Sequence, residues 1–367
     1  MRRTGRFMLI AIGTIVGALL VLIAALLMTS AGVSPTFRDA SGQVVANSIS
    51  EKLRVEINGA EQGMFIVGKD RTRPVLLFLH GGPGMPEFAL SRNYPSVLED
   101  LFVVCWWDFR GSGLSYRSDA SVTLEQLVLD TIAVTTYLRQ RFGQDKVYLM
   151  GHSGGSLVGI QAAARAPELY HSYIGVAQIT QQMDSEKLAY RFMREQFAAL
   201  GDRKMVDALD RIPLPQLQTM PAEYRALRDG AMHALGVGTT HTMRSVVTGI
   251  FLPIMLSPVY TLREKIDLWR GKWSAQSTNM WNELLATDLP AIVPRISVPV
   301  YFLHGKYDYT VSYDMARDYL DRLEAPLKGF YTFDESAHSP LFEEPERMRQ
   351  ILEDDVLAGS VSRADRP

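Results

Sequence analysis

A serine near the middle of the chain has the neighbours of a catalytic nucleophile. Ser153 is the central residue of the pentapeptide 151–155, Gly-His-Ser-Gly-Gly, which follows the apolar run 146–150 and precedes a helical pattern. Between a strand and a helix, Gly-x-Ser-x-Gly forms a sharp turn that exposes the serine hydroxyl at the edge of a sheet. The pentapeptide alone is weak evidence, but its flanking strand and helix predict a nucleophile elbow.

A serine hydroxyl becomes a good nucleophile only when a base takes its proton. Two histidines lie beyond residue 294, His304 and His338. His304 ends the apolar run 298–303 and is expected to be a packed residue at a strand end. His338 lies in a loop after the last expected strand, 329–333, and is therefore the predicted base.

The carboxylate that orients this histidine is expected between the serine and the histidine, because this kind of elbow occurs with the chain order serine, acid, histidine. Asp308 follows the run 298–303, in a turn from which a carboxylate can meet a histidine after the next strand. Asp184, one strand earlier, is the alternative. We predict Asp308 as the acid.

Three glycines in the segment 80–84, His-Gly-Gly-Pro-Gly, follow the apolar run 75–79. The tetrahedral intermediate of acyl transfer needs N–H donors directed at its oxyanion, and glycines let the backbone approach a substrate closely. One donor is expected from the amide of Gly154, directly after the nucleophile. The other is expected from Gly82, with Gly81 as the alternative.

Short apolar runs that alternate with amphipathic helices position these residues. The expected strands are 75–79, 101–107, 146–150, 173–177, 298–303 and 329–333. Such an alternation is typical of a parallel sheet with helices on both faces. Before it, the alternating segment 53–57, Asn58-Gly59 and a short strand at 64–67 predict an antiparallel hairpin. The predicted fold class is α/β, with a mostly parallel sheet.

Capping residues and composition indicate the helices. Thr123 precedes a predicted helix over 124–142, and Thr261 begins one over 261–269. Between residues 178 and 294 the strand runs vanish, and a helical stretch rich in Met and Trp replaces them. We expect a helical cap over the carboxyl edge of the sheet, with most of these residues forming its own core. The predicted segments are 1–29 (cytoplasmic stub and anchor), 30–50 (tether), 51–177 (core), 178–294 (cap), 295–358 (core) and 359–367 (tail).

The first thirty residues are predicted to contact a membrane. From Phe7 to Met28 no residue is charged, and Arg2, Arg3 and Arg6 precede this run. A helix of 22 residues spans roughly 33 Å, close to the ~30 Å hydrocarbon core of a bilayer. Because arginines stay on the cytoplasmic side, we predict a single-pass anchor in the cell membrane with the remaining chain on the extracytoplasmic side. A cleaved signal peptide, which would release a secreted protein, is the alternative.

Composition excludes several classes of protein. Among 367 residues, 38 Lys and Arg balance 40 Asp and Glu, which argues against nucleic acid as a partner. The single cysteine, Cys105, excludes an internal disulfide and a cysteine-built zinc site, and it is expected to be buried and inert. No nucleotide-binding glycine loop or metal-ligand cluster occurs, so we expect no cofactor and a small-molecule or short-peptide substrate. The oligomeric state is left open.

These motifs together resemble the proline iminopeptidase branch of the α/β-hydrolase superfamily. The resemblance is carried by the segments 80–84 and 108–115 (Asp-Phe-Arg-Gly-Ser-Gly-Leu-Ser), the Ser153 elbow, Asp308 and His338, and it covers roughly residues 50–357. It implies an α/β-hydrolase fold with a helical cap that selects substrates, and a serine hydrolase without a cofactor. In the peptidase members, acidic cap residues hold the free N-terminal amine of the substrate.

The chain departs from this family pattern at three places. Phe109 replaces the usual glutamine, and Gly154 replaces the tryptophan that often follows the nucleophile. The family's Trp-x-x-Trp-Glu pattern is missing from the cap, where Trp281-Asn282-Glu283 is the nearest match. Glu283 is therefore the candidate for substrate binding.

Two activities fit the motifs, and a third class fits less well. The resemblance implies release of an N-terminal residue from small peptides, whereas the apolar, Met-rich cap favours an esterase or lipase-like hydrolase of a small carboxylic ester. A catalytically inactive fold used for binding would have a broken triad, but all three positions are filled here.

Overall fold

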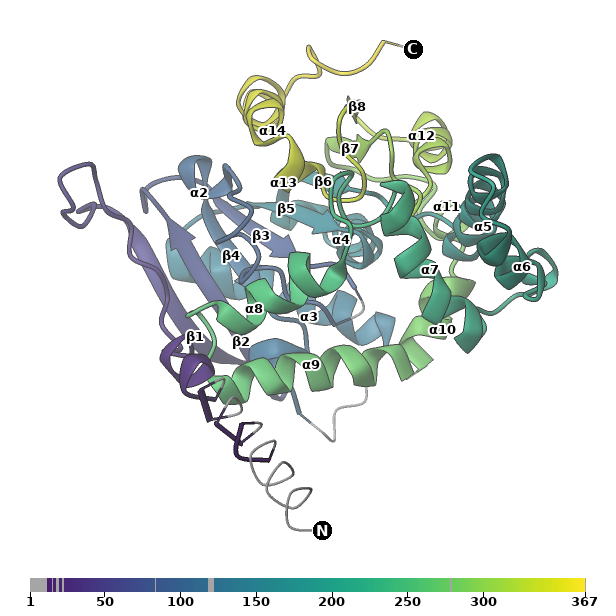
Figure 1. Ribbon diagram of the computed structural model, residues 1–367. Helices are drawn as coiled ribbons and strands as arrows, with labels where there is room; N and C mark the ends of the chain where they lie inside the picture. Colours follow the sequence, from purple (N-terminus) through teal and green to yellow (C-terminus); the bar gives the residue numbers. More distant parts are fainter. Residues whose placement is uncertain are drawn as a thin grey trace.

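An eight-stranded sheet forms the centre of the protein (Figure 1), whose computed structural model describes residues 12–14, 16–17, 20–21, 23–82, 84–117, 122–277 and 279–366. The strand order is β1-β2-β4-β3-β5-β6-β7-β8. The strands are β1 (Ile49–Ile57), β2 (Ala60–Gly68), β3 (Val75–Leu79), β4 (Val103–Trp107), β5 (Val147–His152), β6 (Tyr170–Val176), β7 (Val300–Gly305) and β8 (Lys328–Phe333).

Only β2 runs against the other strands of this sheet. It pairs antiparallel with both β1 and β4, whereas every other pair of neighbours is parallel. Asn58 and Gly59 connect β1 to β2, and both have positive φ angles, 48° and 72°. Two positive φ angles characterise the tight hairpin turn that Asn-Gly favours. The predicted parallel sheet with an antiparallel N-terminal hairpin is thus confirmed.

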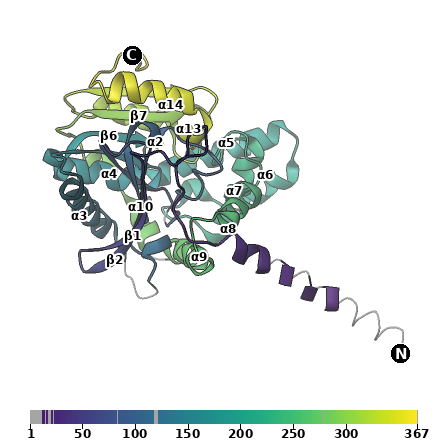
Figure 2. The ribbon, with the colours of Figure 1, turned by 90° about the vertical axis from the view of Figure 1, so that its left-hand side faces the viewer.

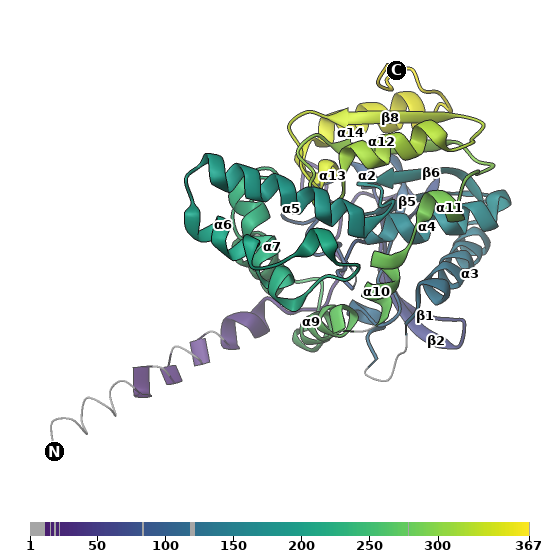
Figure 3. The same cartoon turned by 90° about the vertical axis from the view of Figure 1, so that its right-hand side faces the viewer.

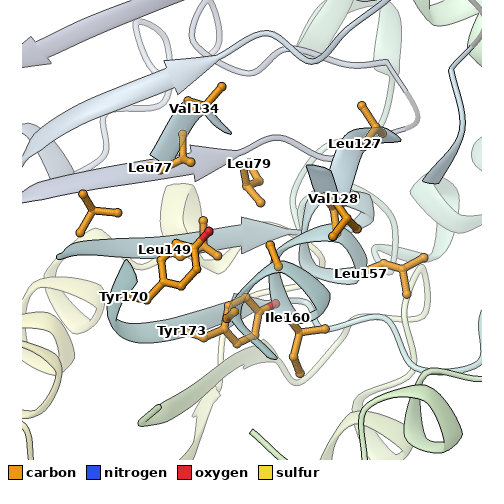
Figure 4. Close-up of a cluster of buried hydrophobic side chains, with 14 of the residues drawn as sticks. Leu77, Leu79, Leu127, Val128, Val134, Leu149, Leu157, Ile160, Tyr170 and Tyr173 are labelled. Atoms are coloured by element: carbon orange, nitrogen blue, oxygen red, sulfur yellow. The ribbon is translucent and has the colours of Figure 1, made fainter. Parts of the chain in front are cut away.

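Helices cover both faces of the sheet. Alternate residues of a strand point to opposite faces, and accordingly Leu77 and Phe78 belong to different core clusters. One cluster includes residues of α3 (Leu124–Phe142), α4 (Gly154–Arg165) and α12 (Tyr313–Arg322), and part of it is shown in Figure 4. The other face holds α2 (Leu98–Leu101) and α14 (Pro345–Ile351). Short helical turns complete this part: η1 (Gly113–Ser115), η2 (Pro167–Leu169), α13 (Pro340–Glu343) and η5 (Leu352–Val356).

A helical cap lies between β6 and β7, as predicted. Its elements are α5 (Gln182–Ala199), α6 (Arg203–Asp210), η3 (Leu214–Gln216), α7 (Ala222–Leu235), η4 (Val247–Phe251), α8 (Leu252–Leu256), α9 (Leu262–Ser277), α10 (Asn279–Ala286) and α11 (Leu289–Ile292). Figure 3 shows α5, α6 and α7 projecting to one side of the sheet. Met183, Met193, Met220 and Met232 are buried together in a core of the cap's own, which explains much of its methionine content.

Local capping signals set two helix starts. The Thr123 side chain accepts a hydrogen bond from the Gln126 amide at the start of α3. At the start of α9, the Thr261 amide donates to Glu264 and the Glu264 amide donates to the Thr261 hydroxyl, which is a capping box. α9 continues to Ser277, beyond the predicted end at residue 269.

The segment predicted as a tether is bound to the body of the protein. The amides of Gly32 and Val33 donate to the Pro258 carbonyl at 2.8 and 3.2 Å, and Phe37 packs against the core. Among the described residues, no helix has the length and apolarity that crossing a membrane requires. The predicted span Phe7–Met28 lies partly outside those residues, which omit 1–11, 15, 18, 19 and 22.

Candidate active site

Ser153 lies in the sharp turn between β5 and α4. Its φ angle is +51°, a region that non-glycine residues rarely adopt, and the strain is typical of a functional turn. A Cβ atom on Gly151 would meet the Gly155 carbonyl oxygen at 2.5 Å, and one on Gly155 would collide with the Leu79 carbonyl. Close approach of three backbone segments therefore requires both glycines of the elbow, and the elbow is confirmed as a local structure.

Asp308 and His338 come together at the carboxyl edge of the sheet. His338 Nδ1 lies 2.9 Å from Asp308 Oδ2, and both side chains are buried. The amides of Thr310 and Val311 donate to Asp308 Oδ1, both at 2.9 Å. Burial alone would raise the pKa of Asp308, but His338 and the other donors hold it well below its usual range. Asp308 is therefore ionised and can fix the ring of His338.

The alternatives weighed for these roles have other positions. Asp184 is on α5, not in a loop, and its exposed carboxylate pairs with Lys187 at 3.2 Å. His304 is fully buried at the end of β7, as expected, but it also approaches Asp308 Oδ2 at 3.3 Å and donates to the Val311 carbonyl at 3.1 Å. Because His304 Nε2 faces two acceptors, it carries the proton and adds a further donor to Asp308.

The loop that carries His338 is bound directly to the elbow. His152, the neighbour of Ser153, places its Nε2 2.8 Å from the His338 carbonyl oxygen, and the two rings are 5.0 Å apart. Within the described part of the chain, the Ser153 hydroxyl has no hydrogen-bond partner, and it is not joined to His338 by a hydrogen bond. Such catalytic bonds are often long in free enzymes and tighten when substrate binds.

The glycine-rich loop after β3 packs on the elbow. The Gly81 amide donates to Glu87 Oε1 at 2.7 Å, so it is already occupied. The amides of Gly82 and Gly154 have no partner within the described residues. A Cβ on Gly154 would lie 2.5 Å from the Gly82 carbonyl oxygen. The glycine that replaces the family's tryptophan thus allows this close contact, and Gly82 stays ahead of Gly81 as the expected donor.

This contact gives a prediction for Gly154→Ala. We expect kcat to fall roughly tenfold or more, because the added methyl group pushes the Gly82 backbone away from the position in which its amide can stabilise an oxyanion. Steady-state rates of the variant measure the effect. Gly230→Ala is the matched control, since a methyl group there meets no atom within 4 Å. An unchanged kcat for Gly154→Ala would contradict the proposed role of this contact.

A buried ion pair joins the glycine-rich loop to the elbow. Glu87 accepts from the Gly81 amide and contacts His152 Nδ1 at 2.9 Å, and both charged side chains are buried. Burial opposes both charges, yet the mutual attraction lowers the pKa of Glu87 and raises the pKa of His152. Sequence reasoning missed this pair, because Glu87 lies in an irregular loop with no motif. Glu87 and His152 hold three segments of the site together.

Removing this carboxylate is expected to destabilise the fold. Glu87→Leu leaves the Gly81 amide and a buried His152 without their acceptor, which typically costs about 3–5 kcal/mol. Urea unfolding monitored by circular dichroism measures the change. Glu125→Ala, which removes an exposed ion pair with Arg165, is the control and should cost about 0–1 kcal/mol. Equal, small effects of both substitutions would contradict the structural role of Glu87.

The environment of His338 predicts a pH dependence. Burial lowers the pKa of His338 from its usual 6.5, and the charge of Asp308 offsets this only in part. The neutral ring is the form that takes a proton, so activity should be lost as the pH falls through a pKa below 6.5. kcat/KM of a non-titrating ester, measured against pH, tests this; an acid limb centred above 6.5 would contradict it.

Further predicted residues have structural partners. Glu283 Oε2 accepts from the Leu124 amide at 3.0 Å, so it caps the N-terminus of α3 and joins α10 to it. This contact gives Glu283 a structural role, and its contact with substrate stays a prediction. Phe109 packs on His80 with ring centres 4.2 Å apart, and its amide donates to His80 Nε2. Cys105 is fully buried, as expected, and burial raises the pKa of its thiol. No cluster of potential metal ligands occurs among the described residues.

Known proteins resemble this chain in sequence and in fold. The profile of a family described as alpha/beta hydrolase fold matches residues 74–345. A probable aminopeptidase of Bacillus subtilis (strain 168), YbaC, is 33% identical over 308 residues, which cover 83% of this chain and 96% of the relative. The crystal structure of a proline iminopeptidase from Mycobacterium smegmatis matches 84% of this chain and all of its own, with a TM-score of 0.59 and 22% identity. A bacterial membrane phospholipase A matches 98% of this chain and 99% of its own, with a TM-score of 0.57 and 16% identity.

Proposed function

Because this chain belongs to the α/β-hydrolase fold family, we propose that it is a serine hydrolase in which Ser153, Asp308 and His338 form the catalytic triad. The observation that supports the triad most directly is the 2.9 Å hydrogen bond between His338 Nδ1 and Asp308 Oδ2, in a loop bound to the strained elbow. Nδ1 donates to the carboxylate, so Nε2 of the neutral ring is left as the base.

The reaction then proceeds in two halves. Ser153 Oγ attacks the substrate carbonyl while His338 Nε2 takes its proton, and the amides of Gly82 and Gly154 donate to the resulting oxyanion. His338 next gives this proton to the leaving amine or alcohol, and an acyl-enzyme on Ser153 remains. Water attacks the acyl group as His338 takes one of its protons, and the return of that proton to Ser153 releases the acid.

For the substrate, we propose small peptides from which the enzyme releases an N-terminal residue. The support is the likeness to a probable aminopeptidase over 83% of this chain, together with the proline iminopeptidase-like segments 80–84 and 108–115. A helical cap over the carboxyl edge of the sheet is a common means of selecting substrates in such folds.

A rate comparison tests this assignment. The full chain in detergent would be given a prolyl fluorogenic amide and, separately, short-chain p-nitrophenyl esters, with Ser153→Ala as the blank. The proposal predicts amide turnover that N-acetylation of the substrate abolishes, because an aminopeptidase needs the free amine. Turnover of esters without any turnover of the amide would contradict the peptidase and establish the esterase.

The esterase is the second candidate because of the surface of the cap. Several large apolar side chains of η4, α8 and α9 are exposed, and a membrane phospholipase A has a similar fold over 98% of this chain. An ester substrate that partitions into lipid would suit an enzyme with such a surface. The same rate comparison, extended to esters of longer acyl chains, separates the two candidates.

We also propose that Phe7–Met28 anchors the hydrolase in the cell membrane, with the catalytic part on the extracytoplasmic side. The uncharged run and the preceding arginines support the anchor. Residues 23–28 are helical, and they lead to Thr29, which is bound to the cap. N-terminal sequencing of the protein from washed membranes tests the proposal: an intact N-terminus supports an anchor, whereas a soluble chain that begins near Ala31 indicates a cleaved signal.

A further inference from the structure

One face of the cap exposes a group of large apolar side chains. This cap face consists of Val247, Phe251, Leu252, Leu256, Ile266 and Trp273, which are between 41% and 78% exposed. They come from η4, α8 and α9, and the Phe251 ring lies 5.1 Å from the Trp269 ring, so these elements pack side by side. Single exposed apolar residues are common, but a contiguous group indicates an interaction surface.

The exposed side of α9 has the composition of a helix that lies at a membrane surface. Arg263, Ile266, Arg270 and Trp273 follow one another at intervals of three or four residues, which places them on one side of the helix. Arg263 and Arg270 are 92% and 64% exposed, and each also lies within 4 Å of the Asp267 carboxylate on the same helix, at 3.7 and 3.4 Å. Trp favours the boundary between lipid and water, and Arg pairs with lipid phosphates while its stem covers apolar surface.

The N-terminal helix is fixed at the edge of this face. Lys265 of α9 is fully buried, and its ammonium donates to the Thr29 carbonyl at 2.9 Å, the Ser30 hydroxyl at 2.9 Å and the Met255 carbonyl at 2.7 Å. Burial lowers the pKa of Lys265 to about 8. Figure 2 shows the helix leaving the body beside α8 and α9. A single lysine thus ties the end of that helix to α8 and α9, two of the three elements of the cap face.

We propose that the cap face binds the surface of a phospholipid bilayer. The inference rests on the proposed anchor: Met28 ends the predicted span, and the next residue, Thr29, is already held between α8 and α9. A bilayer that contains the run must therefore lie close to the cap face. A second copy of the chain is the competing occupant, and the position of the N-terminal run at the edge of the cap face favours lipid over it.

Fluorescence quenching in vesicles tests the proposal. Leu256→Cys and Leu200→Cys would each be labelled with the environment-sensitive fluorophore NBD, since the native Cys105 is buried and does not compete. Leu200 is the matched control, because it is 70% exposed but follows α5, outside the cap face. The full chain would be reconstituted in vesicles of phosphatidylcholine and phosphatidylglycerol. We expect lipid-bound nitroxides to quench the label at 256, and aqueous iodide to quench it severalfold less than the label at 200.

The other outcomes are distinguishable. Equal iodide quenching at both positions, in a chain that floats with the vesicles, would overturn the docking but keep the anchor. A label at 256 shielded from both quenchers would indicate a second protein copy instead of lipid. A chain that does not float would overturn the anchor and the docking together, whereas labelling of Ser153 by a fluorophosphonate reports on the hydrolase independently. Trp273→Cys provides a second labelling site if Leu256→Cys lowers the melting temperature.

Discussion

Replacing Ser153 with alanine is expected to abolish turnover while the fold remains intact. Loss of a triad nucleophile lowers kcat by about 10⁵–10⁶-fold, because the histidine and the aspartate of the triad act through the serine. The Ser153 hydroxyl forms no hydrogen bond within the described residues, so its removal should change the free energy of unfolding by less than about 0.5 kcal/mol. Steady-state kinetics and urea unfolding of the same preparation measure both effects.

Two controls sharpen this prediction. Ser156→Ala removes a nearby buried hydroxyl that donates to the Ser153 carbonyl, and it should lower stability more than catalysis. Wild-type enzyme treated with a fluorophosphonate should match the rate of Ser153→Ala. If Ser153→Ala kept more than a few per cent of the wild-type rate, another nucleophile would have to carry the reaction.

Replacing Asp308 with asparagine has the second largest expected effect. The variant keeps the size of the side chain, but its amide can donate to His338 Nδ1 and so favour the wrong tautomer of the ring. In triads of this kind that change costs about 10⁴-fold in kcat. The full effect is expected at the pH optimum, where His338 is neutral in the wild type.

Asp184→Asn is the matched control for this substitution. Asp184 is 59% exposed and pairs with Lys187 on the same helix, so its replacement should leave kcat close to the wild-type value. If instead Asp184→Asn lowered kcat and Asp308→Asn left it unchanged, the catalytic acid would be Asp184, which follows the earlier strand. It would also make the observed contact between Asp308 and His338 a structural one.

Much of the fold could be predicted because its signals are local. Asn58-Gly59 specifies a hairpin turn, Thr123 and Gln126 start α3, and Gly143 ends it in the left-handed conformation. The run 75–79 matches β3 residue for residue, since both faces of the strand are buried and leave no polar interruption. β6 begins at Tyr170, three residues before the predicted start. The prediction missed these residues because the exposed His171 interrupts the apolar run by which the strand was identified.

The parts that could not be predicted depend on contacts between distant segments. Glu87 contacts His152, which is 65 residues further along the chain, and Lys265 contacts Thr29, which is 236 residues away. No sequence motif relates the two members of either pair, so neither contact could be predicted. Glu283, predicted as a substrate contact, also caps a helix whose first residue is 159 positions away, and no motif indicated that second role. Burial and partners decide these roles, and a sequence motif specifies neither.

A single labelling measurement tests the central claim most directly. The full chain would be treated with a fluorophosphonate, digested and analysed by mass spectrometry, beside Ser153→Ala and His338→Ala. The triad predicts one modified residue, Ser153, with labelling absent from the first variant and strongly slowed in the second, because the hydroxyl is activated by the base. Equal labelling of all three proteins, or modification of a different residue, would contradict the claim that Ser153 is the nucleophile of this hydrolase.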